Sequence, residues 1–202
     1  MWCASHCLCP RKLNMPTSPQ PLAPLPAALS FWERVRLHLD SRESPMTDIE
    51  PGLSSSIAPA AVAEERQFDF WLGDWDVTWG EGQHGRNHVE AILDGRVILE
   101  QFDGRPGTPL RGMSLSVYSP ALKAWRQTWV DAEGSYWAFN GGFDGTRMTL
   151  VTDDVRNGQP VKLRMVWHNL AAGSLDWRWE RSDDAGQTWL ALWQLHYTRR
   201  SP

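Results

Sequence analysis

The sequence predicts an all-β protein, a single antiparallel up-and-down β-barrel of about eight to ten strands with a short helical plug before the first strand. Two observations predict this fold class. From residue 74 almost to the C-terminus, apolar and polar residues alternate with the period of two that is typical of strands, and no long segment shows the helical period of about 3.6. Dipeptides that favour tight hairpins separate the alternating segments.

The barrel is expected to begin at the aromatic segment FDFWLGDWDVTW, residues 68–79. Residues 67–72 form the predicted helical plug, because this short apolar turn directly precedes the first alternating segment. The segments that read as strands, about ten in number, are residues 74–80, 86–93, 96–102, 111–118, 124–131, 135–140, 147–153, 161–168, 175–181 and 188–198. Closing this meander into a barrel removes the free strand edges that invite aggregation.

The connections between these strands carry turn-forming residues. Tight hairpins are predicted at Asp94-Gly95, Asp103-Gly104, Asp144-Gly145 and Asn157-Gly158. A further connection, SDDAGQTW at residues 182–189, matches the S-x-D-x-G-x-T-W pattern that is called an Asp-box in sialidases. Because the pattern occurs once, we interpret it as a hairpin brace without glycosidase activity. In this brace the Asp184 carboxylate accepts backbone N–H groups and Trp189 packs beneath it.

Side chains two residues apart share one face of a strand, so the alternation assigns an inside and an outside to the barrel. The faces assigned to the interior hold Trp75, Val77 and Trp79; Trp125, Gln127 and Trp129; Val161, Leu163, Met165 and Trp167; Leu175, Trp177 and Trp179; and Trp189, Ala191, Trp193, Leu195 and Tyr197. The opposite faces hold Asp76, Thr78, Arg126, Thr128, Lys162, Arg164, Asp176, Arg178 and Glu180. A barrel of this size is either filled by its interior side chains or holds one small ligand.

The composition of the chain changes near residue 60. Residues 1–60 are rich in proline and poor in glycine, whereas residues 66–199 hold most of the aromatic residues and form the predicted barrel domain. We expect the first part to be mostly disordered, because segments rich in proline, serine and alanine with little periodicity rarely bury enough apolar area to offset the entropy of ordering. An alternative is that it is an extension assigned upstream of a true translation start at Met46.

Composition and charge exclude several classes of protein. The formal net charge is −4 at pH 7 and no basic cluster stands out, so no nucleic-acid partner is expected. No segment has the roughly 18–20 apolar residues of a membrane-spanning helix, and neither Met1 nor Met46 begins a secretory signal. The predicted location is the cytoplasm, with no membrane partner.

Few residues offer ligands for a metal, and no metal or cofactor is predicted. The cysteines, Cys3, Cys7 and Cys9, lie at the start of the chain and lack the second pair of ligands that a zinc site needs. His84 and His88 straddle a loop and a strand start, so they lack the helical spacing of a zinc-binding pair.

Several segments resemble a bacterial family catalogued as domain of unknown function 1579: FDFWLGDWDV at 68–77, WRQTWVDAEG at 125–134, DWRWERS at 176–182 and WQLHY at 193–197. The resemblance covers essentially residues 66–199. Gly73-x-Trp75 after an aromatic turn also resembles the opening of calycin-like barrels, the group of lipocalins and fatty-acid-binding proteins. This implies a basic side chain, Arg199 or Arg178, packed across Trp75. It implies no agreed activity, and the missing pair of inward arginines argues against a fatty-acid carboxylate as ligand.

The leading functional hypothesis is non-catalytic binding of an apolar or aromatic small molecule in a tryptophan-lined barrel cavity. The residues expected to line this cavity are Trp79, Trp125, Gln127, Trp129, Trp167, Trp177, Trp193 and Tyr197. No catalytic residues are predicted, because the sequence has no nucleophile elbow, no phosphate-binding loop and no dinucleotide-binding fingerprint.

Three alternatives stay open from the sequence. One is a haem-binding barrel that resembles the nitrobindins, with His168 or His196 as the axial ligand. Another is an isomerase or cyclase on the same scaffold, for which Gln127 and Asp131 on one interior face are the support. The third is a fully packed barrel that acts through its surface or as a homodimer.

Overall fold

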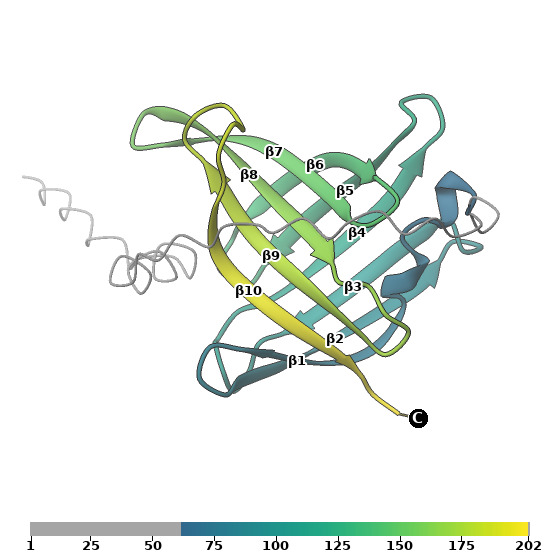
Figure 1. The fold of residues 1–202 in the computed structure, drawn as a ribbon. Helices are drawn as coiled ribbons and strands as arrows, with labels where there is room; N and C mark the ends of the chain where they lie inside the picture. Colours follow the sequence, from purple (N-terminus) through teal and green to yellow (C-terminus); the bar gives the residue numbers. More distant parts are fainter. Residues whose placement is uncertain (1–61, 202) are drawn as a thin grey trace, which may run out of the picture.

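A computed structural model describes residues 62–201 and shows a closed barrel of ten antiparallel strands, which confirms the predicted fold class (Figure 1). Two short 3-10 turns precede the strands, η1 (Glu64–Arg66) and η2 (Asp69–Trp71). The strands are β1 (Gly73–Trp79), β2 (Gln83–Ile92), β3 (Val97–Asp103), β4 (Arg111–Ser119), β5 (Ala124–Asp131), β6 (Tyr136–Phe143), β7 (Met148–Arg156), β8 (Gln159–His168), β9 (Ser174–Ser182) and β10 (Leu190–Arg199).

Each strand pairs with the next one along the chain, and β1 closes the barrel by pairing with β10, drawn in yellow in Figure 1. The closing register sets Trp75 opposite Arg199 and Val77 opposite Tyr197. Among residues 62–201, no helix has the length and apolar character needed to cross a bilayer. The predicted N-terminal extension, Met46 included, lies outside the described residues.

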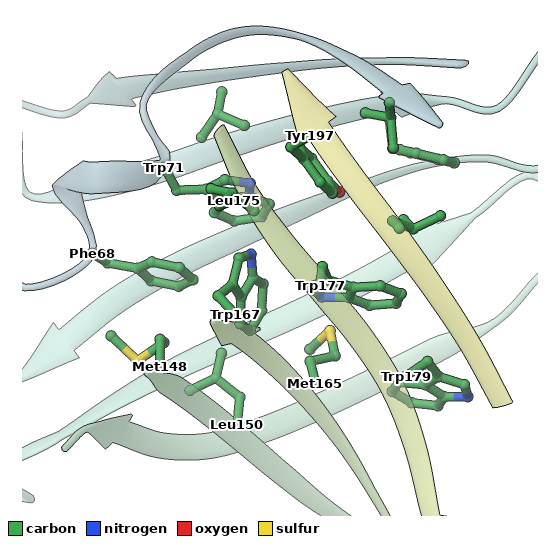
Figure 2. Close-up of a cluster of buried hydrophobic side chains, with 14 of the residues drawn as sticks. Phe68, Trp71, Met148, Leu150, Met165, Trp167, Leu175, Trp177, Trp179 and Tyr197 are labelled. Atoms are coloured by element: carbon green, nitrogen blue, oxygen red, sulfur yellow. The ribbon is translucent and has the colours of Figure 1, made fainter. Parts of the chain in front are cut away.

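The predicted helical plug is η2 with the residue before it. Phe68 and Trp71 are fully buried; their rings stack with centroids 5.0 Å apart (Figure 2). Phe68 also meets Trp125 and Trp167 edge to face, at 5.4 and 4.9 Å. Edge-to-face and offset aromatic pairs add stability beyond their buried area. The plug therefore seals the end of the barrel at which β1 begins.

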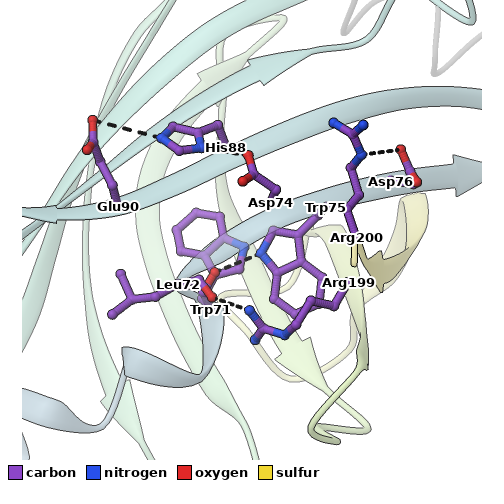
Figure 3. A network of polar contacts seen from close by, with 9 residues as sticks. All are labelled: Trp71, Leu72, Asp74, Trp75, Asp76, His88, Glu90, Arg199 and Arg200. Carbon is purple, nitrogen blue, oxygen red and sulfur yellow. Dashed lines mark hydrogen bonds and ion pairs between the residues drawn. The ribbon is translucent and has the colours of Figure 1, made fainter. Parts of the chain in front are cut away.

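Arg199 packs across Trp75, as the resemblance to calycin-like barrels implies (Figure 3). Its guanidinium carbon lies 4.2 Å from the Trp75 ring centroid, and its N–H groups donate to the carbonyl oxygens of Leu72 and Phe70 at 2.6 and 3.3 Å. A Cβ on Gly73, whose φ is +133°, would lie 2.2 Å from this guanidinium. Only glycine leaves the required space here.

The predicted inside and outside of the barrel are confirmed, except at the start of β10. Trp189 and Ala191, assigned to the interior, lie outside: the Arg164 guanidinium covers the Trp189 ring at 4.0 Å, and Ala191 pairs with the outward-facing Glu180. The reason is a β-bulge between Ala191 and Trp193, which reverses the alternation within the strand. From Trp193 onward the assignment holds.

The Asp-box segment is a hairpin brace, as expected. The Asp184 carboxylate accepts the backbone N–H groups of Gln187 and Thr188 at 3.0 and 2.9 Å, and the Trp189 indole donates to the Gly186 carbonyl at 3.0 Å. Another predicted turn is wrong. The connection after β3 is no tight turn at Asp103-Gly104 but a loop, residues 104–110, that folds back over the barrel end away from the plug.

Candidate ligand-binding cavity

The interior side chains leave a cavity of about 40 Å³ in the middle of the barrel. Its walls come from six strands and from the loop that precedes β4. The residues that line it are Glu100, Phe102, Leu110, Trp129, Trp137, Phe139, Met165, Trp167, Trp177, Trp179, Trp193, Leu195 and Tyr197. Most of these side chains are aromatic, and Figure 2 shows Met165, Trp167 and Trp177 directed into the same interior space.

The size of this cavity limits what it holds without rearrangement. A buried water needs roughly 10–15 Å³, so the space has room for about three waters. Pockets for drug-sized ligands measure roughly 300–1,000 Å³. A larger ligand therefore requires that some rings of the wall move.

Five of the eight predicted lining residues line the cavity: Trp129, Trp167, Trp177, Trp193 and Tyr197. The other three point inward without reaching it. Trp125 packs against the plug. Gln127 is buried and donates to the Ser116 hydroxyl at 2.8 Å. Trp79 packs edge-on against Trp193, with centroids 5.4 Å apart.

The predicted lining omitted the other eight residues, although the alternation had assigned three of them, Met165, Trp179 and Leu195, to the interior. Glu100 is the most informative of the remaining five. It lies two residues from Ile98 and two from Phe102, both buried, so the period of two places it on the inner face of β3. The signal was obscured because Val97 and Leu99, on the other face of the strand, are apolar too.

Glu100 is 6% exposed and hydrogen-bonded by neutral neighbours. Its carboxylate accepts the Ser114 hydroxyl at 2.6 Å and the Asn87 amide N–H at 2.8 Å. Burial raises the pKa of Glu100 from 4.5 to about 7, because desolvation outweighs the two hydrogen bonds, which lower it. The Asn87 amide also donates to the Tyr197 hydroxyl at 3.3 Å, and burial raises the pKa of Tyr197 well above 10.

The end of the cavity away from the plug is formed by partly exposed rings. Trp129 and Trp137 are cross-strand partners on β5 and β6, and both are half-buried. Leu110, from the loop over this end, is buried against the cavity. At Gly107 in the same loop, a Cβ would lie 2.7 Å from the Trp79 ring. This end is therefore closed by partly exposed side chains and a loop, in contrast to the plugged end.

The other sequence candidates lie away from the cavity. His168 and His196 are on the outer face, where His196 pairs with Asp176 at 2.7 Å. The Asp131 carboxylate accepts the backbone N–H groups of Glu133 and Ser135, so it braces the hairpin after β5. His88 pairs with Asp74, and across residues 62–201 no three histidine, cysteine or acidic side chains are grouped to hold a metal ion.

The closed antiparallel barrel, together with an arginine of the last strand packed on the tryptophan of the first, is consistent with a calycin-like fold. A scan against models of known protein families finds no match, and a search of curated proteins finds no match either.

Proposed function

We propose that this barrel binds a small apolar or aromatic molecule in its interior and releases it without chemical change. The observation that carries this proposal is the convergence of Trp167, Trp177, Trp179 and Trp193 on one cavity. Ligand pockets are lined mostly by apolar and aromatic side chains with a few placed polar groups, and this lining has that composition.

Binding requires side chains to rearrange at the barrel end away from the plug, because the existing cavity holds only about three waters. The half-buried rings of Trp129 and Trp137 are the candidates to move, since Phe68 and Trp71 of the plug are fully buried and Arg199 ties the plug to β10. A ligand entering here replaces ring contacts within the protein by contacts with its own apolar surface. The free energy needed to move these rings lowers the affinity for the ligand.

We also propose that the chain belongs to the bacterial family of unknown function 1579. The aromatic opening at 68–77 and the tryptophan-rich ending at 176–182 support this assignment. An experimental structure of a member of that family that lacked a closed barrel would contradict it.

Thermal shift and tryptophan emission of the full chain, measured with benzene, propylbenzene and naphthalene, test the proposed function. Binding to the native state raises the melting temperature as the free ligand concentration rises above Kd. Changed tryptophan emission together with a saturable rise in melting temperature supports interior binding. If none of the three probes changes the melting temperature up to its solubility limit, the proposed function is contradicted.

A second candidate function, a packed barrel that acts through its surface as a homodimer, is favoured by one observation on the outer face. Met113, Leu115 and Val117 of β4 point outward and are 45, 48 and 39% exposed. They lie in one row beside Val97 and Leu99 of β3. A continuous apolar strip of this kind suits a second copy of the same chain. Sedimentation of wild type and of Leu115→Lys distinguishes the cases: a dimer that the substitution dissociates supports this function, and a wild-type monomer at high concentration excludes it.

A further inference from the structure

The cavity wall contains one buried acid and no basic side chain. Within the described part of the chain, the residues that line the cavity include neither lysine, arginine nor histidine. The groups that act on the Glu100 carboxyl are neutral, namely Asn87 and Ser114. Buried carboxylates are normally paired with a cation, because an unpaired buried charge is costly. Glu100 therefore has no cationic partner among residues 62–201.

One neighbour of Glu100 carries a hydrogen-bond acceptor without a partner among the described residues. Asn87, 2% exposed, uses its N–H groups on Glu100 and Tyr197, whereas its Oδ1 atom is buried and has no partner among the described residues. Native structures rarely leave such an atom unsatisfied without a bound water or ligand. The one titratable group that faces Glu100 from β10 is Tyr197, while β2 and β4 contribute Asn87 and Ser114, which do not titrate.

The rest of the wall favours cations as well. Indole faces carry negative electrostatic potential and attract ammonium groups within about 6 Å, most strongly when water is excluded. Trp177 and Trp193 line the same cavity as Glu100, and their rings meet edge to face at 5.9 Å. A carboxylate and indole faces around one small space are the chemistry that recognises an organic ammonium ion.

Building on the proposed function, we propose that the ligand is an organic amine whose apolar or aromatic body lies among the indoles and whose protonated nitrogen donates to Glu100. Asn87 does not itself line the cavity, so the contact that the proposal requires is the one between the ammonium group and the Glu100 carboxylate. Because burial holds the pKa of Glu100 near 7, an ammonium ion binds the ionised form and releases a proton. Its affinity therefore falls as the pH is lowered below about 7.

Calorimetric titration with three probes of matched size tests this inference: phenethylamine, a cation; propylbenzene, neutral; and 3-phenylpropionate, an anion. At pH 8, wild type is expected to bind phenethylamine at least about tenfold more tightly than propylbenzene and to reject the anion. In Glu100→Gln this preference disappears while propylbenzene binding persists. The matched control, Glu81→Gln at an exposed loop position, behaves as wild type.

The pH dependence of the wild type decides the question even if Glu100→Gln fails to fold. Between pH 8 and pH 6, a carboxyl with a pKa of about 7 loses about nine-tenths of its ionised fraction, so phenethylamine affinity falls about tenfold. Propylbenzene affinity stays constant. Equal binding of amine and hydrocarbon, or amine binding independent of pH, overturns the amine inference but leaves the proposed function intact. Failure of every probe to bind overturns both.

Discussion

Glu100 and Ser114 are directly opposite each other on β3 and β4, and the serine hydroxyl donates to the carboxylate at 2.6 Å inside the barrel. This bond only partly offsets the loss of hydration, because the pKa of Glu100 rises from 4.5 to about 7. An ionisable group of this kind makes the stability of the fold depend on pH.

Glu100 is expected to destabilise the barrel as the pH rises. The folded state holds the Glu100 proton more tightly than the unfolded chain, so its contribution to stability is fully present below pH 4.5 and is lost as the pH rises through about 7. The loss is at most about 3 kcal/mol. Urea unfolding at pH 5 and pH 8 measures it. Glu100→Gln should remove most of this dependence and Glu81→Gln should retain it; the same dependence in both variants would show that another group is responsible.

Arg199 should contribute more to the free energy of unfolding than its neighbour Arg200. Arg199→Ala removes the contact with Trp75 and the hydrogen bonds to the plug carbonyls, and we expect a loss of about 1–3 kcal/mol in the free energy of unfolding. Arg199→Lys should recover less than half, because the planar fork is lost. Arg200 pairs with Asp76 at 3.6 Å in an exposed position, so Arg200→Ala should cost less than about 1 kcal/mol. Equal losses in chemical unfolding would contradict this assignment.

A larger side chain in the cavity should weaken ligand binding without unfolding the protein. Leu195 is 4% exposed and lines the cavity, and Leu195→Phe fills part of the existing space. We expect propylbenzene affinity to fall at least about tenfold, with a change in stability below about 3 kcal/mol. The control is Leu115→Phe on the outer face, which should bind as wild type. If calorimetry finds that Leu115→Phe weakens binding and Leu195→Phe does not, the ligand lies on the outer surface.

The Asp184 brace should stabilise the last hairpin only while its carboxylate is ionised. Hydrogen bonds from Ser182 and Thr188 hold the pKa of Asp184 well below its ordinary 3.8. Its contribution is therefore present above pH 3.8 and is lost as the pH falls further. Asp184→Asn is expected to melt at a lower temperature than wild type at pH 7, with the difference shrinking in strong acid. Asp183→Asn, at an exposed neighbour, should melt as wild type, and scanning calorimetry of both variants checks this.

Much of the fold could be predicted because the period of two is continuous and the hairpin residues are explicit. The resemblance carried by the first strand predicted a basic side chain packed on Trp75 but left Arg199 and Arg178 as alternatives, and the structure places Arg199 there. The bulge before Trp193 was not, because one inserted residue leaves no change in composition. Trp189 was consequently assigned to the wrong face.

The cavity was less predictable than the barrel around it. In β4 the apolar residues Met113 and Leu115 face outward and Ser114 faces inward, so the usual rule for assigning faces gives the reverse of the observed arrangement. Glu100 lies in a strand with apolar residues on both faces. Which indoles reach the cavity depends on three-dimensional packing, as Trp125 shows by contacting the plug instead.

A crystal structure of the protein grown with propylbenzene tests the central claim most directly. We predict density for the probe within the barrel, in contact with Trp177 and Trp193, and a displaced Trp129 or Trp137 ring at the barrel end away from the plug. Density for the probe only on the outer surface, with the interior rings unmoved, would contradict the claim that the barrel is a ligand-binding protein.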